Sequence, residues 1–561
     1  MRLTTPMVLL SVLLAVAGCG PSAEKAGENR VVFARGGVVL PGPASAGTFA
    51  VVTIDNATVR LADPQPMAGG AFFRWAWKPG DNCTVELHPS GGAAAFRQRA
   101  WAPMRPEAGV VAAVTLEKVH EGSITAGGEP DAAVAFSQDG TLLALGTFGG
   151  YLRVFNTTSG ACVFEKRFPS AVVKRAAISA DNLRVYAGEM SYDGFVSAWD
   201  LASTKELWRF RLADELGVSK PARPDDFFGL YSYPQAYCLR AVGADLIVDG
   251  FHSWNADGKP KHLSRMYRFD GATGAVRWKF PADAPLPRNI TWFDVDAKTI
   301  ALSAYQWERP AEGDSLPQAA LSVLDIANGK LRHSRSFEPL KPFFDVVPMW
   351  YGLAYDGQGN LALGFMDGRA HLFSIQHEDV AGADMSAFKM TRNLDLASPI
   401  EVTGVPVYAG VGWAAGAAGR LFLLTDGRLV APSASAQGKT IRADHPNSNT
   451  LFTFDGATGK LLWQWKLTTT AQSVAAGGNV VAVATQQSYS SDDPMDYGVT
   501  VFDASASGTP VEKMLFRYNT AGPIVALAVS PDGSRIAAVE APVRLADGMI
   551  VVGKYRLHII R

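Results

Sequence analysis

Residues 132–168 read AAVAFSQDGTLLALGTFGGYLRVFNTTSGACVFEKRF, and this stretch decides the fold. It contains four short apolar and aromatic runs separated by turns rich in Gly, Asp, Ser and Thr, a pattern that predicts four β-strands. The predicted strands are Ala132–Phe136, Thr141–Gly146, Tyr151–Phe155 and Ala161–Phe168. Four short strands joined by tight turns make a small antiparallel sheet that needs neighbouring copies to bury its faces.

The turn before the fourth strand recurs along the chain as a short phrase. It consists of an aromatic residue or Leu, an acidic or amide residue, two or three further residues, and Gly. The clear copies are Phe155–Gly160, Phe269–Gly274, Leu324–Gly329 and Phe454–Gly459, and the looser ones are Trp199–Thr204 and Phe502–Gly508. A turn phrase that repeats every few tens of residues, with strands on both sides, indicates a repeat architecture.

The repeats predict an all-β fold, an eight-bladed β-propeller, with seven-bladed as the alternative. The predicted blades are residues 131–168, 171–212, 235–280, 289–338, 345–396, 400–467, 471–517 and 521–561.

The last repeat lacks its fourth strand, because the chain ends just after the third-strand run Lys554–Ile560. The run Val110–Val119, before the first blade, belongs to no repeat. Since an open strand edge invites aggregation, we expect this run to be the outer strand of the last blade and to close the ring. The propeller would then span residues 110–561.

Residues 30–108 carry no copy of the phrase and predict a separate small β-sandwich. Alternating patterns in Phe72–Trp77 and Thr84–Leu87 are typical of antiparallel strands with one buried face. The predicted strands are Arg30–Leu40, Thr48–Ile54, Ala71–Trp77, Cys83–Leu87 and Ala94–Trp101.

Two copies of the phrase continue to a Trp four residues after the Gly, namely Trp278 and Trp463, with Ala-Thr-Gly after the Asp. This pattern resembles the quinoprotein-alcohol-dehydrogenase-like propellers, and the Ala-Val-Ala-Phe-Ser-Gln-Asp-Gly start of the first blade resembles WD repeats. The resemblance covers residues 130 to 561. It implies that the Asp and Thr bond turn backbone groups and that the Trp packs between blades.

The cysteines argue against a quinone cofactor. In the resembled quinoprotein dehydrogenases an adjacent Cys-Cys pair lies over the quinone beside Ca²⁺ ligands, and this chain has no Cys-Cys dipeptide. Besides Cys19 it has Cys83, Cys162 and Cys238, which we expect to be single buried thiols, with one long-range disulfide as the alternative.

The N-terminus has the features of an export signal: Arg2, the apolar run Met7–Val16, and small residues before Cys19. Val16-Ala17-Gly18-Cys19 resembles the lipobox of bacterial lipoproteins, which implies a signal peptide at 1–18, lipidation of Cys19 and a tether at 19–29. The alternative is an ordinary cleaved signal. By resemblance to lipoprotein sorting, Gly20 favours anchoring in the outer membrane, on its periplasmic side or at the cell surface.

Charge excludes one class of partner. With 52 basic and 53 acidic side chains the chain lacks the excess positive charge of a nucleic-acid-binding protein. After the N-terminus no stretch has the length and apolar purity of a membrane-spanning helix.

Long insertions fall on one predicted face of the ring, which is where function usually lies on a rigid scaffold. They are Leu212–Gln235, Phe251–Ser264, Gln306–Gln318, Leu424–Asn449, Ser488–Gly498 and Ala541–Gly548. Their aromatic and polar side chains suit contact with a protein or a saccharide. The candidate binding-face residues are Phe228, Tyr231, Tyr233, His252, Trp254, Trp307, Arg309, His445, Tyr489 and Tyr497. The alternative is that these loops pack on one another and cap the ring.

Enzymatic motifs are absent from the sequence. Asp492, Asp493 and Asp496 have carboxylate oxygens that could ligate Ca²⁺, although a solvated acidic loop is the preferred interpretation of these residues. No Gly-x-Ser-x-Gly, His-Glu-x-x-His or Cys-x-x-Cys-His motif occurs.

The expected function is therefore a non-catalytic scaffold of the cell envelope that binds a protein partner through the long-loop face. It resembles the propeller lipoproteins that assist outer-membrane protein assembly. One alternative is a ligand-binding or enzymatic propeller (hydrolase, lyase or quinoprotein-like) with its site at the central axis. Another is carbohydrate attachment through the sandwich, which would need Trp75, Trp77 and Trp101 to be exposed and coplanar.

Overall fold

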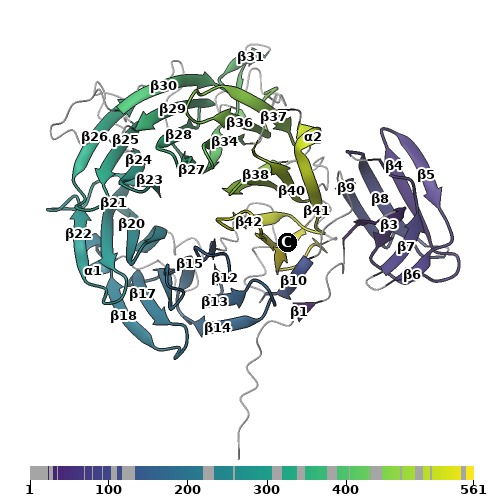
Figure 1. Cartoon of the computed structure of the whole chain (residues 1–561), viewed down its shortest axis with the longest axis horizontal. Helices are drawn as coiled ribbons and strands as arrows, with labels where there is room; N and C mark the ends of the chain where they lie inside the picture. The colour runs from purple at the N-terminus through teal and green to yellow at the C-terminus, as the bar shows by residue number, and fades with distance from the viewer. Residues whose placement is uncertain are drawn as a thin grey trace, which may run out of the picture.

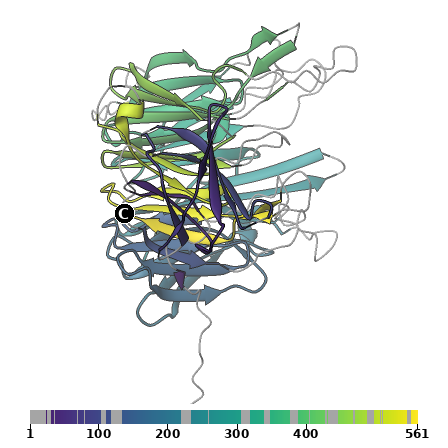
Figure 2. The same cartoon turned by 90° about the vertical axis from the view of Figure 1, so that its right-hand side faces the viewer.

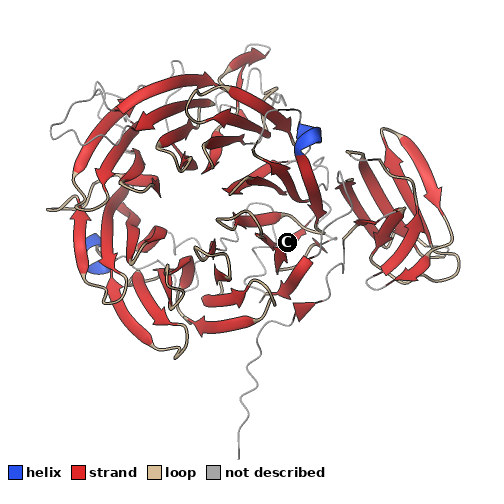
Figure 3. Ribbon diagram, in the orientation of Figure 1, coloured by secondary structure: helices blue, strands red, loops and turns tan. Residues whose placement is uncertain are grey.

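The computed structural model is a ring of β-sheets with a smaller β-domain at its rim (Figure 1). The described residues are 23–24, 30–34, 36–67, 70–78, 80–90, 92–102, 110–116, 133–218, 233–256, 259–305, 319–337, 348–375, 388–402, 405–426, 429–430, 445–467, 470–486, 497–505, 508, 510–544 and 551–561. Nearly all regular structure in these residues is strand (Figure 3).

The rim domain is a sandwich of two four-stranded antiparallel sheets, with strand orders β2-β3-β7-β6 and β5-β4-β8-β9. Every second residue of β8 points inward, so Cys83, Val85 and Leu87 pack with Phe33 and Phe73 between the sheets. The strands are β2 (Val32–Ala34), β3 (Gly37–Leu40), β4 (Phe49–Ile54), β5 (Ala57–Leu61), β6 (Gln65–Met67), β7 (Gly70–Arg74), β8 (Asn82–His88) and β9 (Phe96–Trp101). The predicted single run at 30–40 is thus a hairpin, β2–β3, and the sequence did not predict β5 and β6.

The ring is a β-propeller built of four-stranded antiparallel units, and strand pairing gives eight of them in the part of the chain that the structure describes. One eight-stranded sheet holds two units, β15–β18 and β19–β22, joined by the single pairing Met190↔Gln235.

The first four units consist of β11 (Ala133–Phe136), β12 (Leu142–Gly146), β13 (Tyr151–Asn156) and β14 (Cys162–Arg167); β15 (Val172–Ile178), β16 (Arg184–Met190), β17 (Phe195–Asp200) and β18 (Glu206–Arg211); β19 (Gln235–Val242), β20 (Asp245–Ala256), β21 (Lys259–Asp270) and β22 (Val276–Phe280); and β23 (Asn289–Val295), β24 (Thr299–Tyr305), β25 (Ala319–Asp325) and β26 (Leu331–Phe337).

The next three units consist of β27 (Pro348–Tyr355), β28 (Asn360–Phe365), β29 (Arg369–Ile375) and β30 (Phe388–Asp395); β33 (Val411–Ala417), β34 (Arg420–Thr425), β36 (Thr450–Asp455) and β37 (Leu461–Lys466); and β38 (Thr470–Gly477), β39 (Val480–Gln486), β40 (Gly498–Asp503) and β41 (Met514–Asn519). The last unit consists of β42 (Ile524–Val529), β43 (Ile536–Glu540), β46 (Arg556–Ile560) and β10 (Val110–Thr115).

The last unit joins the two ends of the ring. Strand β10 pairs antiparallel with β46, from Val110↔Ile560 to Thr115↔Arg556. The closing strand is shorter than the predicted 110–119, because pairing ends at Thr115. Two residues of the predicted tether also form a strand, β1 (Ala23–Glu24), which pairs with the outer edge of β10 and so satisfies backbone groups there.

Aromatic side chains join neighbouring blades at the recurring turns. The indole Nε1 of Trp208 donates to Gly271 O at 3.0 Å, and that of Trp278 donates to Ile326 O at 3.1 Å. In these two copies the Gly that ends the phrase lies against the indole: a Cβ would be 2.6 Å from Trp208 on Gly274 and 2.7 Å from Trp278 on Gly329. Since the backbone there also has a positive φ, 72° at Gly274, the phrase requires Gly for two independent reasons.

Insertions build up one face of the ring. Strands β20 and β21 run for 12 residues each, and their hairpin projects beyond the blades in Figure 2. The sequence predicted a loop at 251–264, but cross-strand pairing continues through Phe251↔Ser264 to Ala256↔Lys259. Short added elements are β31 (Ile400–Val402), β32 (Val405–Tyr408) and β35 (Leu429–Val430) in one small sheet, β44 (Val543–Arg544) paired with β45 (Val551–Val552), α1 (Ala213–Leu216) and α2 (Pro510–Lys513).

The sandwich packs on the rim beside β37 and β41. Trp101 lies edge-on to Trp465 at 5.7 Å between ring centroids, and its backbone N–H donates to Asn519 Oδ1 at 3.4 Å. Gln98 accepts a hydrogen bond from Val31 N at 2.8 Å and donates to Thr520 O, so one buried amide joins both domains.

Candidate ligand site in the central channel

The innermost strands of the blades surround a cavity of about 1330 Å³ on the ring axis. The lining strands are β11, β15, β19, β23, β27, β33, β38 and β42. An innermost strand points its alternate side chains toward the two neighbouring blades. The channel is therefore lined largely by backbone atoms and by the residues that depart from this alternation.

Such departures occur near the start of seven innermost strands, each of which has a shift in register. The shifts lie between Val173 and Arg175, Ala236 and Cys238, Ile290 and Trp292, Pro348 and Leu353, Val411 and Trp413, Ala471 and Ser473, and Ile524 and Ala526. A bulge turns one extra residue out of the pleat and re-aims its neighbours. Repeated around the ring, the bulges bring Arg175, Tyr237, Trp292, Tyr351 and Trp413 to the wall of one cavity.

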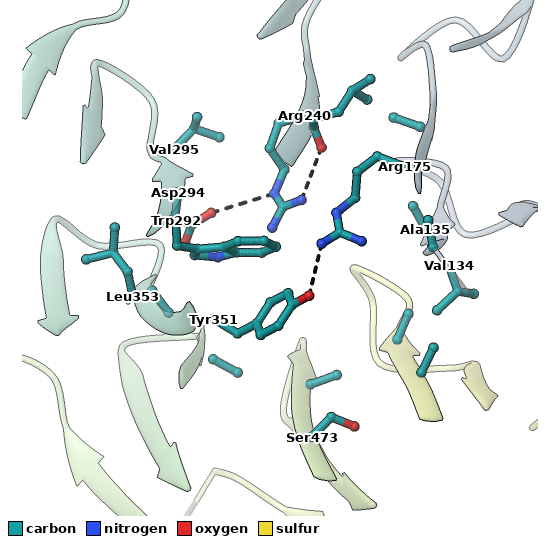
Figure 4. A pocket seen from close by; sticks show the side chains of 18 of the residues that line it. Val134, Ala135, Arg175, Arg240, Trp292, Asp294, Val295, Tyr351, Leu353 and Ser473 are labelled. Carbon is teal, nitrogen blue, oxygen red and sulfur yellow. Dashed lines mark hydrogen bonds and ion pairs between the residues drawn. The ribbon is translucent and has the colours of Figure 1, made fainter. Parts of the chain in front are cut away.

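Arg175 is the central cation of this wall and is only 9% exposed. Its Nη2 donates to the Tyr351 hydroxyl at 3.0 Å (Figure 4). Its Nη1 donates to Lys174 O at 2.9 Å. The guanidinium carbon lies 5.5 Å from the Trp292 ring centroid and 5.7 Å from that of Tyr351, within cation–π range. Among the described residues no carboxylate forms an ion pair with Arg175.

A second arginine, Arg240, lies beside the first (Figure 4). Its guanidinium is 5.3 Å from the Trp292 ring and its Nε is 4.0 Å from Asp294 Oδ1. Burial raises the pKa of Asp294 and Arg240 opposes that shift. Arg240 therefore has a nearby acidic partner, whereas Arg175 does not.

Three aromatic rings form a continuous surface below the guanidinium groups. Trp292 meets Tyr351 edge-on at 4.4 Å, and Tyr351 stacks on Trp413 at 4.5 Å with an angle of 7° between the rings. The backbone of Tyr351 has φ +67°, a conformation that is rare and strained for a bulky side chain.

Small side chains also line the cavity, among larger apolar ones such as Phe136, Val474 and Leu527. The small residues are Ala133, Ala135, Ala414, Ala415, Gly416, Ala475, Ala526 and Ala528. The open volume therefore lies between the cationic and aromatic side chains and strands that have apolar, partly small, side chains.

Three polar side chains on the lining have a buried atom without a hydrogen-bond partner within the described residues. These atoms are Gln235 Oε1, Asn289 Oδ1 and Ser473 Oγ. Gln235 and Asn289 are the first residues of neighbouring strands β19 and β23, so they occupy equivalent places in adjacent blades. Asp426 also lines the cavity, and burial raises its pKa to about 7.

Most residues predicted from the sequence as site residues lie outside the described residues. These are Cys19, Phe228, Tyr231, Trp307, Arg309, Tyr489, Asp492, Asp493 and Asp496.

The other predicted binding-face residues do not form an exposed surface. Tyr233, His252, His445 and Tyr497 are buried, and Trp254 is half-buried. The His252 ring packs on Trp254 at 4.7 Å, and its Nδ1–H donates to Leu216 O at 2.7 Å. These four buried side chains therefore pack inside the fold and do not present a surface to a partner. Removing their apolar ring atoms from water stabilises the fold.

The tryptophans of the sandwich do not form a sugar-binding platform. Trp75 and Trp77 are half-buried against Phe33, and Trp77 Nε1 donates to Gly37 O. Trp101 is engaged with Trp465 at the contact with the propeller. The exposed coplanar set that carbohydrate attachment requires is therefore missing.

Within the described residues Cys83, Cys162 and Cys238 are free thiols, and Cys162 is exposed, contrary to the expectation that all three are buried. No group of three or more His, Cys, Asp or Glu side chains there could hold a metal ion. No helix of that part of the chain is both long and apolar enough to cross a membrane.

The fold and the axial cavity define an all-β propeller protein. No family model and no curated protein matches the sequence. Among solved structures the chain is similar to Sqt1 of Saccharomyces cerevisiae, with a TM-score of 0.45 and 8% identity over 77% of this chain and 96% of Sqt1. It is also similar to BamB from Moraxella catarrhalis, with a TM-score of 0.41 and 14% identity over 81% of this chain and 99% of BamB.

Proposed function

We propose that the protein is a non-catalytic scaffold of the cell envelope. It is anchored in the outer membrane through a lipidated Cys19 and binds a protein partner through the face of the propeller that carries the insertions.

The built-up face is the observation that supports this function. A rigid ring with short turns on one side has, on the other side, the hairpin of the two 12-residue strands β20 and β21 and added short strands (Figure 2). Elaboration confined to one face of a rigid scaffold is typical of a binding surface.

Exposed apolar side chains lie in connections that open on this face. Tyr192, between β16 and β17, is 37% exposed; Val218, after α1, is 49% exposed; and Ile400, at the start of β31, is 39% exposed. Aromatic and aliphatic side chains left in water at such places suit the desolvated centre of a protein interface.

We expect the double variant Tyr192→Glu/Ile400→Glu to lose its partner, because two carboxylates on the interface would have to be desolvated without a counter-charge. The measurement is affinity capture from detergent-solubilised envelopes followed by quantification of the recovered protein. Recovery should fall by about tenfold or more relative to the unsubstituted chain.

Leu183→Glu is the matched control. Leu183 is 56% exposed but lies in the turn between β15 and β16, on the opposite face of the ring. Its variant should recover the partner normally. If no partner is captured at all, or if both variants recover it equally, the scaffold function is wrong.

The anchor has its own test. Replacing Cys19 by Ala removes the thiol that would carry the acyl groups, so the protein should move from the membrane fraction to the soluble fraction and stop incorporating labelled palmitate. Continued membrane association and labelling of Cys19→Ala would contradict lipidation at Cys19.

A second candidate function is favoured by the cavity on the axis, which combines a buried cation, stacked aromatic rings and hydrogen-bonding groups without partners. This candidate is a propeller that binds a small ligand in its channel.

A further inference from the structure

We propose that the central channel binds a small organic anion with a flat apolar portion, and that Arg175 binds its carboxylate or phosphate group. This inference deepens the second candidate function and does not depend on a partner at the built-up face.

The inference rests on the burial of Arg175 without a carboxylate partner. A guanidinium that is nine-tenths buried normally has a carboxylate partner, since an unpaired buried charge is costly. Arg175 instead has a phenol, one carbonyl and aromatic rings, and its buried Nε–H has no acceptor among the described residues. An anion in the channel would supply both the missing charge and the missing acceptor, in the forked geometry that guanidinium groups offer to carboxylates and phosphates.

The acidic residues of the lining do not supply that charge. Asp294 lies beside Arg240, and neither Asp296 nor Asp426 forms an ion pair with Arg175. Burial raises the pKa of Asp426 to about 7, so a large share of this side chain is neutral at neutral pH.

The aromatic side chains indicate a flat ligand. Trp292, Tyr351 and Trp413 present a stepped ring surface next to the guanidinium, and the bulges and the strained Tyr351 backbone hold it there. Stacking on such rings adds affinity beyond area burial, and it selects planar groups.

The size of the cavity indicates that this aromatic surface is open to a ligand. Ala135 and the other small residues leave a volume of about 1330 Å³, larger than the roughly 300–1,000 Å³ of ordinary ligand pockets. The partnerless Gln235 and Asn289 side-chain atoms would give a ligand's polar substituents two hydrogen-bonding positions on neighbouring blades.

The test uses three probes that share one ring system: 2-naphthoate, 2-naphthyl phosphate and the neutral 2-naphthamide. Titration calorimetry of the full chain in detergent should show binding of at least one anion, with the amide at least about tenfold weaker. A preference between naphthoate and naphthyl phosphate would identify the anionic group.

Arg175→Gln should weaken anion binding by about tenfold or more, and Arg175→Lys should retain part of it, because the charge remains while the fork is lost. Arg209→Gln is the control. Arg209 also lies over an aromatic ring, that of Phe195, but at an exposed place on β18 far from the axis. It should bind the anions as the unsubstituted chain does.

Ala135→Phe tests the same site while leaving the Arg175 guanidinium in the chain, because the larger ring would fill part of the channel beside it. It should abolish binding while Arg175 is intact. The inference is overturned if neither anion binds at millimolar concentration, if the amide binds as well as the anions, or if Arg175→Gln and Ala135→Phe both bind normally. Partner capture by Arg175→Gln should be unaffected, so failure here is distinct from failure of the scaffold function.

Discussion

Replacing Glu540 by Ala should lower the free energy of unfolding by about 3–5 kcal/mol, the loss expected when one member of a buried charged network is removed. Glu540 is buried in β43 and accepts three hydrogen bonds: from His558 Nε2 at 2.8 Å, Gly522 N at 2.9 Å and Lys554 N at 3.2 Å. All three donors would lose their acceptor inside the fold. Chemical denaturation followed by tryptophan fluorescence measures the change.

The effect should be concentrated at the closure of the ring. His558 lies on β46, the strand that pairs with the closing strand β10, and its Nδ1 is 2.8 Å from the hydroxyl of Tyr518 on β41 of the neighbouring blade. The guanidinium of Arg30 lies 4.1 Å from the Tyr518 ring, which brings the N-terminal sandwich into the same network. Hydrogen exchange in β10 and β46 should therefore accelerate more than exchange in β23–β26.

Glu206→Ala is the matched control for Glu540. Glu206 pairs with Arg209 at 2.6 Å on the exposed outer strand β18. Since surface ion pairs contribute little, its loss should cost less than about 1 kcal/mol. Equal losses from the two variants, or uniform acceleration of exchange around the ring, would show that Glu540 does not hold the closing blade.

The propeller fold could be predicted from the sequence because its signal is local and repeated. Within six residues the turn phrase contains a Gly with positive φ and an Asp that hydrogen-bonds to the turn backbone, and a strand lies on each side of it. Thr273 N and Thr273 Oγ1, for example, both donate to Asp270 Oδ1 at 2.9 Å. The all-β propeller class is confirmed.

Features that depend on distant pairing were harder to predict. The extension of β20 and β21 into a long hairpin follows from cross-strand partners over residues 251–264, which the sequence predicted to be a long loop. Strand β32 likewise pairs with a distant segment, strand β35, through Val407↔Val430 and Tyr408↔Leu429.

The channel site could not be predicted because bulges, not periodicity, direct its side chains. Sequence reasoning favoured the aromatic loops, and Tyr233 and His252 proved to be buried. The one available signal was a charged pair, Lys174-Arg175, inside the otherwise apolar run Val172–Ile178. A buried strand normally excludes charge, so such a pair marks a position where the strand departs from its regular pleat.

Replacing Asp249 by Val should raise the free energy of unfolding by about 2 kcal/mol at pH 8, which would make a single substitution stabilising. Asp249 lies within β20, is fully buried, and neither of its carboxyl oxygens has a hydrogen-bond partner among the described residues. Desolvation raises its pKa well above the usual value. Val has a similar number of heavy atoms, suits a strand and needs no partner.

The gain should depend on pH in a defined direction. An acid whose pKa is higher in the folded state binds a proton on folding, so stability is greatest below the unfolded pKa near 4 and is lost as pH rises toward the folded value. Burial likewise raises the pKa of Glu189 and of Asp426 to about 7, so each of these two groups should contribute a loss of stability between about pH 4 and pH 7.

Asp249→Asn separates the charge of Asp249 from its unpaired polar atoms. The amide keeps the shape and the missing hydrogen bonds but cannot ionise, so it should match the unsubstituted chain at pH 4 and exceed its stability at pH 8, with Asp249→Val more stable than both. Denaturation curves at the two pH values decide the matter. The prediction is wrong if the difference in the free energy of unfolding between Asp249→Asn and the unsubstituted chain is the same at pH 4 and pH 8. Ionisation of Asp249 would then not destabilise the fold.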